Sequence, residues 1–246
     1  MNMLLLDEFI LKDENLVAVP LQHIANHKKL NPSKDNIVNT NLCIGILNQW
    51  IATAKIIQIV DNTALLKLIS KRPIPTPSKD ILILAIPRPK ALKRTLISAI
   101  TMGIKKIFLI NSANIDKSYW QTHILNPNML KSIIYEALEQ ACDVIMPTIK
   151  ISKFFKPFME DVLPNFMIEY PTKILATLKT DNINNPKIFP PSILVIGPEK
   201  GFTEYEEKMF YNYGFIPLKI NERILKVETA VPAVIAKIAT LITMQN

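Results

Sequence analysis

The chain has 246 residues, of which 49% are hydrophobic, so it can bury a sizeable core and is not of the disordered class. Its 29 lysines and arginines outnumber 21 aspartates and glutamates, and the net charge of +8 favours a polyanionic partner if the charge gathers on one face. Two cysteines without C-x-x-C spacing and three histidines provide little material for a metal centre, so we expect no bound metal.

The first residues, MNMLLLDEFILKDE, place two acids directly after a short apolar run, unlike a secretory signal or a transit peptide. No apolar run approaches the roughly 18 residues that a membrane span requires. We therefore expect a cytoplasmic protein without a membrane partner.

The first part of the chain, residues 1–72, alternates short apolar runs with polar, turn-like stretches, which predicts a small all-β domain. The segment Lys71–Lys79 contains three prolines and is expected to be an extended, exposed linker. We therefore divide the chain into domains 1–72 and 73–246. The expected strands are Asn15–Leu21, Asn41–Leu47, Trp50–Val60 and Ala64–Ser70.

From Asp80 onward, strand-length apolar runs alternate with stretches of helical periodicity, which predicts an α/β domain with a parallel sheet. The expected strands are Ile81–Ile86, Ile104–Ile110, Val144–Ile151, Lys173–Leu178, Ser192–Gly197 and Phe215–Ile220. Helices are expected from Pro89 to Gly103, Pro127 to Ala141, Ser152 to Met159, Thr203 to Gly214 and Glu228 to Met244, with Thr203 and Glu206 forming a capping box.

Two loops directly follow predicted strands: GPEKGFT (Gly197–Thr203) and NERILKVETA (Asn221–Ala230). Ligands of open α/β sheets bind at the carboxyl ends of strands, and glycine permits close approach of the backbone to a ligand. An ordinary tight turn explains GPEKG equally well. Because the Walker A, G-x-G-x-x-G and G-x-S-x-G patterns are absent, nucleotide hydrolysis, dinucleotide binding and hydrolase chemistry are disfavoured.

The run I-G-P-E-K-G-F-T and the following R-I-L-K-V-E-T-A resemble the I-G-P-E-G-G-F and R-I-L-R-x-E-T-A motifs of the small-subunit (16S) ribosomal RNA uridine-N3 methyltransferase family, of the SPOUT superfamily. The segment Glu136–Pro147 also resembles that family's E-A-x-x-Q-x-x-R-x-x-x-P segment. The resemblance implies a PUA-like, RNA-binding β-barrel followed by a trefoil-knotted methyltransferase domain. It also implies S-adenosylmethionine as cofactor, ribosomal RNA or the small ribosomal subunit as partner, and a homodimer.

By the same resemblance, the cofactor lies between the strand end near Ala176 and the two motif loops. Arg223 would steady the target base or its developing negative charge. Alternatively, Arg223 has no role in catalysis and is a solvated charge beside a capped helix. Glu199 would accept a proton or organise its loop, or else cap the following helix. The implied cofactor-binding residues are Leu175, Ala176, Thr177, Ile196, Gly197, Pro198, Glu199, Gly201, Ile220, Asn221, Ile224 and Leu225.

Basic and aromatic residues outside the motifs are candidates for contact with RNA. The group on the first helix of the second domain could follow an RNA backbone or form a solvated helix face. Trp50, Tyr119 and Trp120 could stack on bases or pack in the core. The candidate RNA-binding residues are His23, His27, Arg88, Lys90, Lys93, Arg94, Lys200 and Lys226.

The chain departs from the family pattern at Asp143, Lys200, Asn221 and Lys226. These departures leave two alternatives with the same fold: a catalytically degenerate RNA-binding protein, and a methyltransferase with a different RNA target. A small-molecule α/β enzyme with a β-barrel appendage is a third alternative, which the missing nucleotide and hydrolase motifs disfavour.

Overall fold

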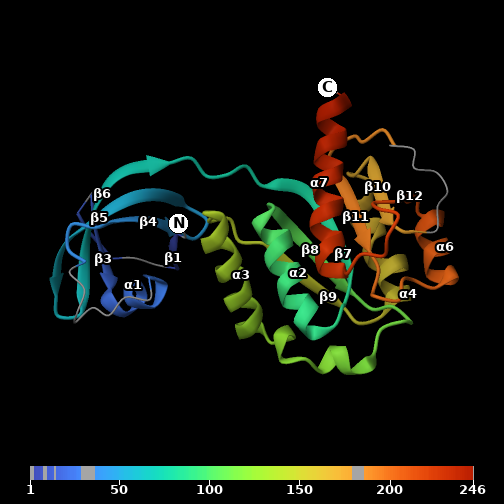
Figure 1. The fold of residues 1–246 in the computed structure, drawn as a ribbon, viewed down its shortest axis with the longest axis horizontal. Helices are drawn as coiled ribbons and strands as arrows, with labels where there is room; N and C mark the ends of the chain where they lie inside the picture. Colours follow the sequence, from blue (N-terminus) through green and yellow to red (C-terminus); the bar gives the residue numbers. More distant parts are fainter. Residues whose placement is uncertain (1–2, 8–9, 14, 29–36, 179–185, 246) are drawn as a thin grey trace. The chain divides into compact units, whose positions relative to one another are not determined.

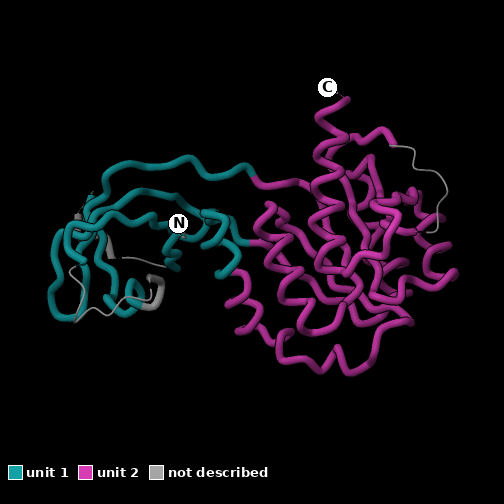
Figure 2. Tube along the Cα trace, in the orientation of Figure 1, with its two compact units in different colours: residues 1–76, 135–146 teal, residues 77–134, 147–246 magenta. Residues whose placement is uncertain are grey.

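The structure is a computed structural model that describes residues 3–7, 10–13, 15–28, 37–178 and 186–245. It forms two compact units (Figure 2). The N-terminal unit contains residues 1–76 and 135–146, and the C-terminal unit contains residues 77–134 and 147–246. The expected boundary after residue 72 stays a prediction; in the structure the units divide after Thr76, and a later segment joins the first unit.

The N-terminal unit is a six-stranded mixed sheet around one apolar core (Figure 1). Among the strand pairings that the structure describes in this sheet, only that between β1 and β4 is parallel, and the others are antiparallel. Every second residue of β4 is buried in the core, as in Leu42, Ile44 and Ile46, because side chains alternate between the faces of a strand. The strand order is β1 (Leu4–Leu6), β4 (Asn41–Ile46), β5 (Trp50–Val60), β6 (Thr63–Arg72), β3 (Leu16–Pro20) and β2 (Ile10–Asp13).

The segment 135–146 completes this unit from a distance in sequence. It holds the last turns of α3 (Pro127–Ala141), where the carbonyl of Glu139 accepts the Met3 N–H at 3.0 Å. Val144, with its carbonyl oxygen 2.8 Å from the Asn48 nitrogen, binds the turn after β4 instead of a sheet neighbour in the C-terminal unit. The predicted strand Val144–Ile151 is therefore wrong in its first half, and β9 is Thr148–Ser152.

The C-terminal unit is built on a six-stranded sheet in which each neighbouring pair of strands is parallel. The central strand β7 is buried along Ile81–Ala85, as expected for a parallel sheet covered on both faces. The predicted α/β class with a parallel sheet is confirmed. The strand order is β12 (Ile216–Leu218), β10 (Thr172–Ala176), β11 (Ser192–Ile196), β7 (Ser78–Ala85), β8 (Ile104–Ile110) and β9.

Helices α2 (Pro89–Thr101) and α7 (Val227–Gln245) pack against one another, and α7 also contacts β11 (Figure 1). α6 (Glu204–Asn212) buries Phe210 among the rings of Phe155, Phe202 and Phe215. The remaining helical elements are α1 (Leu21–Lys28), η1 (Lys117–Gln121), η2 (His123–Leu125), α4 (Phe155–Pro157), η3 (Phe158–Val162) and α5 (Pro164–Met167).

Two expectations about the connections need correction. The linker is shorter than Lys71–Lys79, because Arg72 still pairs with β5 and Ser78 already pairs with β8, which leaves only 73–77 without strand structure. Ser152 does not cap a helix; it is the last residue of β9 and pairs with Ile110. In both places strand pairing satisfies the hydrogen-bonding groups of the backbone. This pairing outweighs the local sequence signals for a linker and for a helix cap.

α7 is long and apolar enough, by length and composition alone, to cross a membrane, although 33% of its most apolar stretch is buried inside the chain. The core helix of a soluble protein passes the same test. Val231, Val234 and Ile238 are buried, and they lie along one side at helical spacing. This burial and the contacts with α2 and β11 show that one side of α7 packs inside the C-terminal unit.

Candidate functional site

A cavity of about 360 Å³ lies where the carboxyl ends of β10, β11 and β12 meet. Three segments form its wall, each directly following one of these strands, as in other open parallel sheets. The lining residues are Ala176, Thr177, Leu178, Ile196, Gly197, Pro198, Glu199, Lys200, Gly201, Phe202, Glu207, Ile220, Asn221, Arg223, Ile224, Leu225, Val227 and Ala230.

The structure brings together almost all residues that the sequence assigned to the cofactor. Leu175 is the exception: it is fully buried in β10 and does not line the cavity, since its neighbour Ala176 faces the other way. The two catalytic candidates, Arg223 and Glu199, both line the cavity.

Sequence reasoning missed five lining residues: Leu178, Phe202, Glu207, Val227 and Ala230. Val227 and Ala230 are three apart on the first turn of α7, so helical periodicity after the second motif could have identified them. Phe202 and Glu207 carry no such signal, because the turn of the chain into α6 brings them to the wall.

Gly197 packs closely against Phe202, so any side chain there would require Phe202 to shift. A Cβ atom built there would lie 3.1 Å from the Phe202 ring and 3.4 Å from the Phe202 nitrogen. Four residues later Gly201 has φ +73, and its N–H donates to the Pro198 carbonyl at 2.8 Å. The segment is therefore a tight turn and also a wall of the cavity, so both readings of GPEKG apply.

The Glu199 carboxylate links this turn to the start of α2. Its Oε1 accepts the Arg88 backbone N–H at 2.8 Å and lies 3.5 Å from the Arg88 Nε. The following helix, α6, is capped instead by the predicted box of Thr203 and Glu206, whose side chains bind each other's backbone N–H groups. The alternative in which Glu199 caps α6 is therefore wrong.

Glu206 joins the loop after β8 to the same wall of the cavity. Its carboxylate is buried and accepts the Ser112 hydroxyl at 3.0 Å, the Ala113 N–H at 2.8 Å and the Thr203 N–H at 2.8 Å. Nearby, Asn114 Nδ2 donates to the Gly201 carbonyl at 2.9 Å. These bonds fix the residues after β8 beside the GPEKG turn.

Glu206→Gln is expected to lower the free energy of unfolding by about 1–3 kcal/mol, because the new amide NH₂ group would face donors that need an acceptor. Urea denaturation measures this change. Glu204→Gln, in the exposed first turn of the same helix, is the matched control and should change it by less than about 0.5 kcal/mol. Equal effects of the two substitutions would contradict the role given to Glu206.

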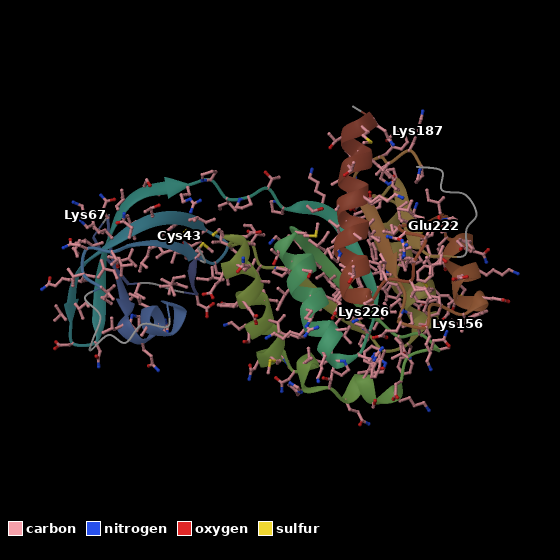
Figure 3. The ribbon with its side chains drawn as sticks, in the orientation of Figure 1. Cys43, Lys67, Lys156, Lys187, Glu222 and Lys226 are labelled. Carbon is pink, nitrogen blue, oxygen red and sulfur yellow. The ribbon has the colours of Figure 1, made fainter. Side chains whose placement is uncertain are left out.

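The first part of the second motif, Asn221–Lys226, forms a largely exposed loop between β12 and α7, and Val227–Ala230 begin α7. Asn221 Oδ1 accepts the Arg223 N–H at 2.9 Å, and Lys219 Nζ lies 2.8 Å from Glu222 Oε2. Figure 3 labels Glu222 and Lys226. The three residues between them in the sequence, Arg223–Leu225, line the cavity. Ile224 is 82% exposed, an unusual position for an isoleucine in a single chain.

The candidate RNA-binding residues are scattered over both units. Lys200 lines the cavity, whereas Lys226 is exposed outside its lining. On α2, the largely exposed Arg94 lies 3.4 Å from Glu228 and Arg88 is held by Glu199, while Lys90 is exposed and Lys93 is half-buried. His23 is exposed on α1, and the side chain of His27 lies outside the described part of the chain.

Asp143, the departure that reverses a charge, has a local structural role. It is buried in the N-terminal unit, where its Oδ1 accepts the Ile145 N–H at 2.9 Å and its own N–H donates to the Leu138 carbonyl. It does not line the cavity. The charge reversal therefore acts on the end of α3 rather than on the pocket.

The parallel sheet with a pocket at three strand ends is the fold of methyltransferases of known structure. A ribosomal RNA small subunit methyltransferase E from Neisseria gonorrhoeae, bound to S-adenosyl methionine, superposes with a TM-score of 0.73 at 21% identity over 98% of both chains. A putative methyltransferase from Legionella pneumophila, also with bound cofactor, superposes with a TM-score of 0.72 at 18% identity over 98% of both.

The chain belongs to the family described as RNA methyltransferase domain, whose sequence model matches residues 75–239. Ribosomal RNA small subunit methyltransferase E 1 of Borreliella burgdorferi is 29% identical over 169 residues, which are 68% of this chain and 69% of that protein. Ribosomal RNA small subunit methyltransferase E of Treponema pallidum is 26% identical over 162 residues, 63% and 59% of the two chains. These matches confirm the family resemblance of the two motif loops.

Proposed function

We propose that the protein is an S-adenosylmethionine-dependent methyltransferase that acts in the cytoplasm on N3 of a uridine in small-subunit ribosomal RNA. The observation that carries this proposal is a cavity formed by three strand-end loops, with Arg223 and Glu199 in its wall. The family membership and the names of the curated relatives support the reaction and the RNA substrate.

The residues of the cavity suit S-adenosylmethionine. The volume of the cavity, about 360 Å³, lies in the range of small-molecule sites. Ile196, Leu225 and Val227 provide an apolar wall that can pack against an adenine ring. Gly197 has no side chain, so a ligand can approach its backbone closely, whereas a Cβ atom there would lie tightly against Phe202. The cofactor supplies an electrophilic methyl group on a sulfonium sulfur.

The residues of the chain must position the target base and favour loss of its imide proton, since the N3 lone pair attacks only after that proton leaves. Arg223 carries a permanently charged, planar guanidinium that can donate to a uracil oxygen and stabilise the developing anion. Glu199 is a positioning residue, because its carboxylate already binds Arg88 and holds the turn against α2.

Calorimetric titration with S-adenosylmethionine tests the cofactor part of the proposal. We expect saturable binding with a Kd on the order of 1 µM to 1 mM, the usual range for enzyme substrates. No binding, even after addition of small-subunit RNA, would refute the enzyme and leave a degenerate RNA-binding protein as the better account.

Three finer features implied by the resemblance are part of the proposal. The methyltransferase domain, residues 73–246, would be trefoil-knotted, as the resemblance of its two motif loops implies. The N-terminal domain, residues 1–72, would be a PUA-like barrel, which its six-stranded sheet around one core supports. That domain would bind RNA, with exposed His23 as one contact.

A homodimer is the last part of the proposal. The outer side of α7 exposes Ala236, Ala239, Thr240, Thr243 and Met244, and Ile224 beside the cavity is also exposed. A helix face of small side chains and one methionine that its own chain leaves uncovered suits a second copy. Light scattering on the eluting protein should give twice the monomer mass, and a monomer at micromolar concentration would contradict this part.

A further inference from the structure

Glu207, on the first turn of α6, is a buried acidic residue in the wall of the cavity. It is 8% exposed and shares the inner side of the helix with Glu206 and Phe210. Its backbone N–H donates to the Thr203 carbonyl at 2.9 Å, as in any helix, which leaves the side chain to reach the cavity. The ring of Phe202, which also lines the cavity, lies 5.1 Å from that of Phe210. The inner side of α6 therefore faces the cavity.

Glu207 adds negative charge to a wall that also carries two cations. Among the residues that the structure describes, the charged ones lining the cavity are Glu199, Lys200, Glu207 and Arg223. Glu199 binds Arg88 outside the cavity, so its charge is already compensated. A buried carboxylate is stable when cations or hydrogen-bond donors surround it. Because a carboxylate has about four acceptor positions, hydrogen bonds within the chain leave room for a donor from a ligand.

S-adenosylmethionine carries positive charge at two places, the ammonium of its methionine portion and the sulfonium. A carboxylate beside the sulfonium would oppose the reaction, because that charge disappears on methyl transfer and the reactant would be stabilised more than the transition state. The ammonium keeps its charge throughout the reaction. A carboxylate can therefore bind the ammonium without raising the barrier.

We propose that Glu207 binds the ammonium group of the methionine portion of S-adenosylmethionine. The inference rests on the proposed function and names the residue that distinguishes the amino-acid end of the cofactor. The methionine portion then lies on the α6 side of the cavity. The adenine ring is left to the apolar wall of Ile196, Leu225 and Val227.

Calorimetric titration with two ligands tests the inference: S-adenosylhomocysteine, which has no sulfonium charge, and its deaminated analogue, in which hydrogen replaces the ammonium. The wild type should bind S-adenosylhomocysteine about tenfold or more tightly than the analogue, since the analogue lacks a hydrogen bond between charged groups. In Glu207→Gln this preference should shrink to about twofold or less, because the two changes remove the same interaction. Glu204→Gln, at an exposed glutamate of the same helix, is the matched control and should keep the full preference.

Steady-state kinetics with saturating small ribosomal subunits give a second readout. Glu207→Gln should raise KM for S-adenosylmethionine about tenfold or more and leave kcat within about twofold of the wild type. The reason is that binding energy lost equally from the reactant and the transition state changes only KM. A larger change in kcat would place Glu207 beside the reacting atoms and overturn the inference.

The inference is also overturned if the wild type binds the two ligands equally, or if Glu207→Gln keeps the full preference. Thermal unfolding checks the fold of this variant. If Glu207→Gln does not fold, Glu207→Asp takes its place; it keeps the charge on a shorter side chain and should also show a reduced preference. Failure of the proposed function looks different, since the wild type would then bind neither S-adenosylmethionine nor S-adenosylhomocysteine.

Discussion

Gly197→Val is expected to weaken S-adenosylmethionine binding by about 100-fold or more, which is roughly 3 kcal/mol of binding free energy. The Cβ alone would lie 3.1 Å from the Phe202 ring, so the two methyl groups of valine must displace that ring or fill the cavity that we propose as the cofactor site. Calorimetric titration of the variant measures the loss.

The control for this substitution is Ala113→Val, which adds the same two methyl groups at an exposed position of the C-terminal unit. Thermal unfolding of both variants shows whether the fold survives. Cofactor binding by Gly197→Val within about threefold of the wild type would mean that the cofactor lies elsewhere.

Arg223→Ala is expected to lower kcat by about 100- to 1000-fold, the usual loss when one preorganised donor to a developing anion is removed. The side chain lines the cavity and is exposed, while the turn beneath it is held by the Asn221 side chain, so the loss should come without unfolding. Single-turnover kinetics with saturating cofactor and RNA measure the chemical step.

Two further variants sharpen this test. Arg223→Lys keeps the charge but not the planar pair of donors, so it should recover only part of the activity. Lys208→Ala removes an exposed cation from α6 and controls for a general loss of attraction to RNA. If Arg223→Ala and Lys208→Ala lowered kcat equally, Arg223 would contribute only charge.

The C-terminal fold was predictable from the sequence because its strands are continuous apolar runs separated by helices with clear caps. β11 is buried throughout and β7 is buried from Ile81 to Ala85, and the T-x-x-E pattern at Thr203 forms the expected capping box. These signals are local, and the tertiary structure reinforces them.

What the sequence could not reveal depends on contacts between distant segments. Nothing local to Val144 indicates that it binds the turn at Asn48, nor that Glu199 reaches Arg88 instead of its own helix. The N-terminal helix α1 was also missed, since an eight-residue helix with a weak apolar pattern gives little signal beside neighbouring strands.

The departures from the family motifs now divide into two groups. Lys200 and Asn221 line the cavity, and the Asn221 side chain accepts the Arg223 N–H and closes the turn there. Asp143 and Lys226 do not line it. An altered substrate preference should therefore be sought at Lys200 and Asn221.

The most direct test of the proposed function is to incubate the protein with methyl-labelled S-adenosylmethionine and unmethylated small ribosomal subunits. The products are then mapped by mass spectrometry of the ribosomal RNA. We predict one labelled nucleotide, a uridine methylated at N3, and no label with the Arg223→Ala variant on the same time scale. Label on another base or on no RNA at all would contradict the assignment of this chain as a small-subunit uridine-N3 methyltransferase.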